Sequence, residues 1–223
     1  MCTGLHRLVV PGMALALAAW GAGCGGSEDQ SPAESEAASA SSNGASTTAW
    51  MIVAESDLTS EQQARFEQAA AARDALFGRL VSMLLAELQN GGPAAAVEVC
   101  SQNAPELATN VSEEMGVTIG RTSWKLRNPA NQPPEWAVDL IAERPERTRV
   151  LTGPDETLAT LMPIRMMNTC LMCHGPVDQI SSGVRTALGE HYPEDEATGF
   201  EEGDLRGWFW VEVPASAPDE ASG

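Results

Sequence analysis

The sequence contains few basic residues and few cysteines, and it lacks a long apolar run outside its N-terminal segment. Thirteen Lys and Arg stand against 31 Asp and Glu, which gives a formal net charge of −18 over 223 residues. Nucleic-acid binding needs clustered basic side chains against phosphates, so this composition argues against it. No stretch after residue 23 is long and apolar enough to cross a bilayer as a helix. The length suits one globular domain with appendages.

The N-terminus has the pattern of an export signal. Arg7 supplies a positive charge, the segment Leu8 to Trp20 is mostly apolar, and small residues follow. The run Gly21-Ala22-Gly23-Cys24 resembles a bacterial lipobox, in which the signal is removed before the cysteine and the thiol is acylated. We therefore predict a signal peptide at 1–23, lipidation of Cys24, and a location on the periplasmic side of the bacterial envelope, with the lipid as the only membrane contact. Cleavage without lipidation is the alternative.

The rest of the chain divides by composition. Residues 24–48 are rich in Ser, Ala, Gly and Glu, which predicts a flexible tether. We expect an N-terminal helical unit at 49–92 and the main domain at 93–214. The small, acidic tail at 215–223 is expected to be disordered.

Hydrophobic periodicity predicts both helices and strands, and therefore an α+β fold. A helix is expected from Thr59, with Gln62 as its capping-box partner, to Asn90. Further elements are a helix over about 94–115, bent near Pro105, a short helix over 134–143, and strands over 117–124, 157–166 and 206–213. Pro163 is expected to break the second of these strands.

The strongest chemical motif is Cys170-Leu171-Met172-Cys173-His174. Cys-x-x-Cys-His is the attachment pattern of c-type haem. Two thiols three residues apart lie on one side of a helical turn, where both can add to the vinyl groups of one porphyrin. The next residue, His174, then supplies an imidazole to the iron. The motif predicts one covalent haem c, and the export signal agrees with it.

Three other uses of these residues are weaker. A thioredoxin-like motif needs a βαβ context, which is not evident. A zinc site could in principle draw on Cys100, Cys170, Cys173, His174 and His191, but the adjacent cysteine and histidine are awkward ligands for one tetrahedral metal. A disulfide between Cys170 and Cys173 would close a very small, strained ring.

Cys100 is the one cysteine after residue 23 that has no assigned role if Cys24 is lipidated and Cys170 and Cys173 bind haem. One interpretation is a small buried hydrophobe, and on spacing alone it is the commoner one. The other is a thiolate that serves as the second axial ligand. A neighbouring methionine or His191 could also ligate iron, although such methionines more often fill a core; the candidates are Met162, Met166, Met167 and Met172.

Several runs outside this motif carry a family resemblance. They are Val97–Cys100, Ala104-Pro105, Gly120–Asn131, Tyr192–Phe200 and Gly203–Gly207. Over about residues 60–214 they resemble a bacterial and cyanobacterial c-type haem domain of unknown function with a PAS-like fold. The resemblance implies a PAS-like antiparallel sheet and a haem iron with histidine and cysteine axial ligands. Carried over, these ligands are His174 and Cys100.

Arginines and acidic residues around the motif have two interpretations each. Arg121, Arg127 and Arg206 could pair with the haem propionates, because a guanidinium matches carboxylate geometry; surface salt bridges are the alternative. The acidic run from Glu194 to Asp204 is interpreted most simply as a solvated loop.

Two classes of function follow from a covalent haem. The first is single-electron transfer by a periplasmic cytochrome-like protein. The second is haem-based sensing of redox state or a small gas, which would act through a separate partner protein. Peroxidase-like catalysis needs an open iron site and a distal acid or base, and the sequence assigns neither. We therefore expect an electron carrier or a sensor rather than an enzyme, with a redox or signalling protein as its partner.

Overall fold

The computed structural model describes residues 49–215. The predicted signal peptide, the lipidated Cys24, the tether at 24–48 and residues 216–223 of the acidic tail lie outside this range. No helix within it is long and apolar enough to span a bilayer.

Five strands and five α-helices, joined by short 3-10 turns, make up the described residues. In chain order they are β1 (Met51–Val53), α1 (Ser60–Asn90), α2 (Gly92–Met115), β2 (Thr118–Thr122), α3 (Val138–Glu143), β3 (Arg149–Thr152), β4 (Leu158–Arg165), α4 (Leu171–His174), α5 (Ser182–His191) and β5 (Leu205–Val213). The strands form one sheet in the order β1-β3-β4-β5-β2, and every neighbouring pair is antiparallel. The expected α+β class is confirmed.

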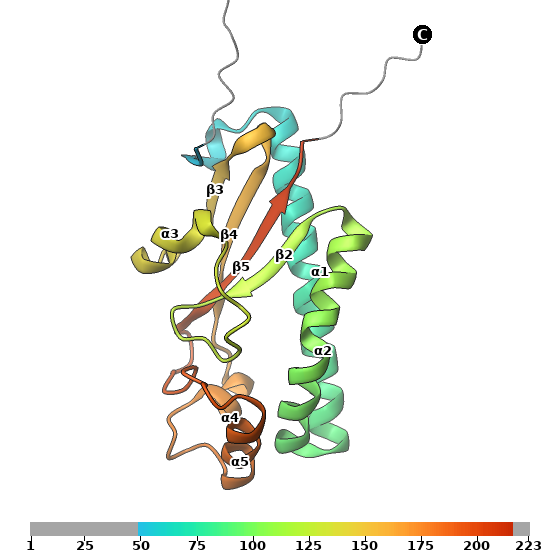
Figure 1. Ribbon diagram of the computed structural model, residues 1–223, viewed down its shortest axis with the longest axis vertical. Helices are drawn as coiled ribbons and strands as arrows, with labels where there is room; N and C mark the ends of the chain where they lie inside the picture. Colours follow the sequence, from blue (N-terminus) through green and yellow to red (C-terminus); the bar gives the residue numbers. More distant parts are fainter. Residues whose placement is uncertain (1–48, 216–223) are drawn as a thin grey trace, which may run out of the picture. The chain divides into compact units, whose positions relative to one another are not determined.

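Alternation along β5 gives the sheet two different faces. Phe209, Val211 and Val213 pack with the buried residues of α1 and α2, among them Leu76 and Val111. Trp208 points to the opposite face, where the apolar residues of α3 cover it. Figure 1 shows α3 on one side of the sheet and the long α1–α2 hairpin on the other.

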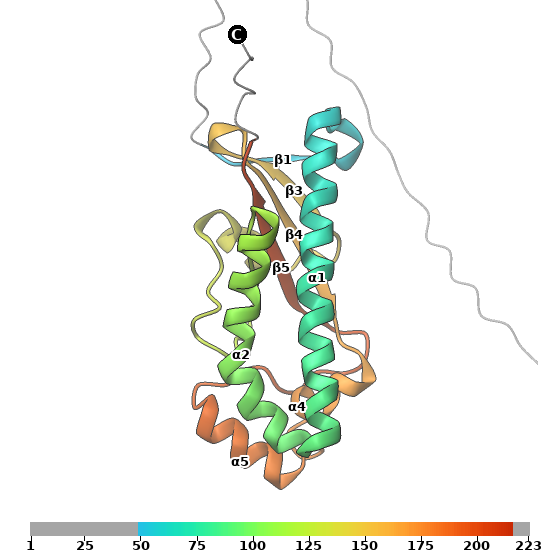
Figure 2. The same ribbon diagram turned by 90° about the vertical axis from the view of Figure 1, so that its right-hand side faces the viewer.

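The α1–α2 hairpin is longer than the sheet that it covers. α1 contacts β4 and β5. α2 contacts β2, and residues near its start, Ala94 and Val97, contact α5. In Figure 2 the connected ends of α1 and α2 run past the strands to the level of α4 and α5. The apolar side chains on that overhang therefore have no sheet to pack against.

The start of α1 confirms the predicted capping box. The Thr59 hydroxyl accepts from the Gln62 backbone N–H at 3.2 Å, and the Gln62 side chain accepts from the Thr59 N–H at 2.9 Å. The residues before it were expected within the helical unit at 49–92, yet they include β1, which pairs with β3.

Pro163 does not break its strand, so that expectation was wrong. β4 continues through Pro163, which pairs with Trp208, and the register shifts only between Ile164 and Arg165. The pairing of β4 with β3 ends at Leu161, so at Pro163 the strand has a neighbour on one side only. A residue without an N–H is tolerated where a strand lacks one neighbour.

The α1–sheet interface should dominate stability. Leu76 is fully buried in it, so Leu76→Ala is expected to lower the free energy of unfolding by about 2–5 kcal/mol. Val138→Ala, at a side chain that is half exposed, should change it by less than about 0.5 kcal/mol. Denaturant titration of the two variants checks this, and equal effects would contradict the assigned core.

Candidate functional site

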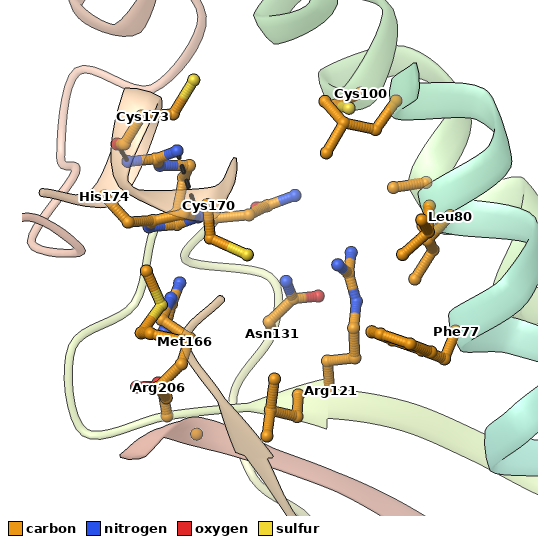
Figure 3. A pocket seen from close by; sticks show the side chains of 18 of the residues that line it. Phe77, Leu80, Cys100, Arg121, Asn131, Met166, Cys170, Cys173, His174 and Arg206 are labelled. Atoms are coloured by element: carbon orange, nitrogen blue, oxygen red, sulfur yellow. Dashed lines mark hydrogen bonds between the residues drawn. The ribbon is translucent and has the colours of Figure 1, made fainter. Parts of the chain in front are cut away.

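A pocket of about 480 Å³ lies between the overhanging ends of α1 and α2 and the segment around α4. One wall is apolar and comes from α1 and the start of α2; its residues are Phe77, Leu80, Val81, Leu84, Leu85, Leu88, Ala96 and Val97. The opposite wall carries the Cys170–His174 motif (Figure 3). The sequence did not single out the α1 wall, although its apolar residues recur at helical spacing.

The Cys170–His174 motif folds as a 3-10 turn followed by the single turn of α4. The loop before β5 fastens this turn by two backbone hydrogen bonds. Phe200 N–H donates to the His174 carbonyl at 3.0 Å, and Gly199 N–H donates to the Gly175 carbonyl at 2.8 Å. Both thiols of the motif and the imidazole line the pocket, and neither thiol forms a disulfide.

The His174 imidazole is held in one orientation. Its Nδ1 lies 2.7 Å from the Ala197 carbonyl oxygen, which can only accept, so Nδ1 carries the proton. Burial, with the nearby Arg127 and Arg206, holds the pKa of His174 well below its usual value. The ring is therefore neutral and Nε2 carries the lone pair. Arg127 Nη1 lies 3.4 Å from Nε2, so a metal bound there would take the place of this contact.

Cys100 reaches the same pocket from the other side. It lies on the face of α2 that carries the buried Ala96, Val97 and Ala104. Figure 3 shows Cys100 beside Leu80, across the pocket from His174. Burial raises the pKa of the Cys100 thiol, while Arg121 and Arg127 act in the opposite direction. A soft sulfur and an imidazole thus approach one cavity from opposite walls.

Arg121 and Arg206 also line the pocket, but their surroundings differ. Burial lowers the pKa of Arg121, and the groups that offset this are Tyr192 and Cys100 rather than a carboxylate. Arg206 donates to the Lys125 carbonyl at 3.1 Å and lies 5.5 Å from the Phe200 ring centroid. Burial and the neighbouring arginines lower its pKa to about 10. Arg121 and Arg206 therefore bring positive charge to the pocket. Within residues 49–215, no carboxylate compensates the charge of Arg121.

Arg127, the third arginine expected to pair with a haem propionate, already has partners within the protein. It forms an ion pair with Asp195 at 3.1 Å and donates to the Cys173 and Ala197 carbonyls. Asp195 belongs to the acidic run that was expected to be a solvated loop. That expectation was wrong for Asp195, whose side chain is 9% exposed, because it faces Arg127 rather than solvent.

The remaining ligand candidates are placed less favourably. Met162 is buried in the α1–sheet core. Met166 lines the pocket but is buried against Ala197 and Phe200. Met167 and Met172 are partly exposed at the pocket, whereas His191 is not among its lining residues. Within residues 49–215, no three His, Cys, Asp or Glu side chains are grouped so that they could hold a metal ion, so the zinc alternative finds no site there.

These observations define a class of protein: an α+β domain whose pocket combines a Cys-x-x-Cys-His turn, an opposing cysteine and an apolar wall. The chain belongs to the Tll0287-like family, whose model matches residues 36–214. The solved structures include a similar protein, described as the cyanobacterial haem protein Tll0287, at 22% identity and a TM-score of 0.53. That match covers 72% of this chain and 99% of the other, and it supports the fold. No match was found among curated proteins.

The pocket residues suit a covalently attached porphyrin. The cavity has the size of a typical cofactor site, its α1 wall is apolar, and its opposite wall carries the attachment motif. The imidazole presents an unprotonated nitrogen, and Arg121 offers a half-buried cation that no carboxylate within residues 49–215 offsets. A flat apolar ring with acidic substituents matches this combination.

Proposed function

We propose that this protein binds one haem c covalently and transfers single electrons. The observation that carries the proposal is that one pocket is lined by the whole attachment motif and by a further cysteine; these residues are Cys170, Cys173, His174 and Cys100. Each thiol of the motif would add its S–H across a porphyrin vinyl group, so that the sulfur bonds to carbon and the hydrogen goes to the neighbouring carbon. When bound, such a haem supplies a one-electron iron couple.

The axial ligands we propose are His174 and Cys100. His174 is neutral and oriented by Ala197, and Cys100 stands across the pocket from it. A site that keeps both ligands suits electron transfer, because neither oxidation state needs an open coordination position. The antiparallel sheet with its flanking helices is compatible with the PAS-like arrangement that the sequence resemblance implies, and we retain that arrangement as part of the proposal.

A redox titration followed by absorption spectroscopy, repeated with added carbon monoxide or nitric oxide, tests the functional class. An electron carrier should show one reversible transition that neither gas perturbs. Ready binding of either gas would instead support the alternative of a haem-based sensor that acts through a partner protein.

Arg121 is proposed to pair with a haem propionate, as is Arg206. Arg121→Met should retain the haem but lower its midpoint potential, because a nearby cation favours the electron-rich state. A unit charge roughly 10 Å from a redox centre contributes about 70 mV at an effective dielectric constant of about 20. Potentiometry checks this against Arg121→Lys, which keeps the charge, and equal potentials in the two variants would contradict the role.

We also propose that the protein is anchored to the bacterial envelope, on the periplasmic side, by lipid at Cys24. The full-length chain with Cys24→Ser should then move from the membrane fraction to the periplasmic extract, because acylation needs the thiol. Immunoblotting of fractionated cells checks this. An unchanged membrane share would contradict the anchor without affecting the haem site.

A further inference from the structure

Asp195 and Arg127 form a largely buried pair beside the His174 ring. The side chains are 9% and 13% exposed, and the Asp195 carboxylate accepts from Arg127 Nε at 3.2 Å. The same carboxylate accepts from the Ala197 backbone N–H at 2.8 Å. Asp195 therefore fixes both the Arg127 guanidinium and the backbone at Ala197.

The Ala197 carbonyl is shared between two donors. Arg127 Nη2 donates to it at 3.2 Å, while His174 Nδ1–H donates to it at 2.7 Å. Arg127 also donates to the Cys173 carbonyl and lies within 3.4 Å of His174 Nε2. One guanidinium thus joins the motif turn, the Ala197 loop and the edge of the imidazole.

We propose that Asp195 and Arg127 act as a positioning pair that sets the electron donation and ring orientation of His174 through the shared Ala197 carbonyl. The inference rests on the proposed haem attachment and concerns residues that the haem motif does not include. A carbonyl that accepts from Nδ1–H makes an imidazole a stronger donor to its metal. A second, cationic donor on the same oxygen withdraws part of that acceptor strength, and Asp195 keeps this donor in place.

The positioning pair predicts effects on the haem spectrum and potential that a change of charge alone would not produce. Arg127→Lys keeps the charge but cannot reach Asp195, Ala197 and Cys173 together, so it should alter the ferric electron paramagnetic resonance g values. Arg127→Met should lower the midpoint potential, because both the cation and its hold on the carbonyl are lost. Arg185→Met removes an equal charge from α5, outside the pocket, where the guanidinium donates to the Val177 and Ile180 carbonyls, and its g values should stay at the wild-type position.

A double-mutant cycle on the purified holoprotein separates positioning from simple charge. Asp195→Asn keeps an acceptor for Ala197 N–H but loses the ion pair. In the Arg127→Met background it should only raise the potential, as loss of a negative charge does. In the wild-type background the rise should be smaller or reversed, because Arg127 is released, and the g values should change.

The control is Asp204→Asn, since Asp204 accepts from the Glu201 backbone N–H at 2.7 Å in the same loop but is exposed. It should leave the g values unchanged. The positioning pair is overturned if Asp195→Asn shifts the potential equally in both backgrounds, or if Arg127→Lys is spectroscopically wild type. Failure of the proposed function would look different, because the wild-type protein itself would then contain no covalent haem.

Discussion

The double variant Cys170→Ala/Cys173→Ala is expected to contain no covalently bound haem. The two thiols are the only groups of the attachment motif that can form thioether bonds, and both line the pocket. Without them, acid–acetone extraction should remove any haem, and the intact mass should equal that of the polypeptide. Each single variant should keep one thioether and resist extraction, while its reduced absorption maximum moves towards that of a haem with one free vinyl group.

Met172→Ala is the matched control for this experiment. Met172 lies between the two cysteines and is 39% exposed, so its removal leaves the attachment chemistry intact. It should retain a full complement of haem after co-expression with a c-type maturation system. Covalent haem in the double variant would contradict the assigned attachment site.

Cys100→Ala is expected to change the absorption spectrum and to raise the midpoint potential. A thiolate ligand is anionic and stabilises the ferric state, so its loss favours reduction. The rise should be on the order of 100 mV or more, within the span of about 0.8 V over which axial ligands set haem potentials. Absorption spectroscopy and potentiometry of the oxidised and reduced variant measure both effects.

Ser101→Ala provides the control for Cys100→Ala. Ser101 is adjacent on α2, but its hydroxyl donates to the Glu98 carbonyl, and it does not line the pocket. Its spectrum and potential should match the wild type. An unchanged spectrum in Cys100→Ala would remove Cys100 as a ligand and leave the interpretation as a small buried hydrophobe.

Local signals in the sequence were enough to predict the elements with strong periodicity. The capping box at Thr59 predicts the start of α1. The strand expected over 206–213 corresponds to β5, in which Trp208 and Phe209 lie on opposite faces of the sheet. β1 and β3 were missed because they have three and four residues, too few for a pattern of period two to stand out. They become strands through pairing with each other and with β4.

The haem attachment motif could be predicted from the sequence more readily than the residues that surround and position it. Cys170, Cys173 and His174 are neighbours in sequence, so their spacing alone indicates a shared cofactor. The role of Asp195 depends on Arg127, 68 positions away, and nothing local distinguishes this carboxylate from the exposed ones around it. The apolar wall of α1 was likewise not assigned to the site, because periodicity shows which face of a helix is apolar but not what covers it.

The most direct test of covalent haem attachment is the intact mass of the wild-type protein, co-expressed with a c-type maturation system and denatured before measurement. Thioether bonds at Cys170 and Cys173 predict a mass higher than that of the processed polypeptide by one haem, with the haem absorption still on the protein. A colourless polypeptide of unmodified mass, with both thiols of the motif free to react with an alkylating agent, would contradict it.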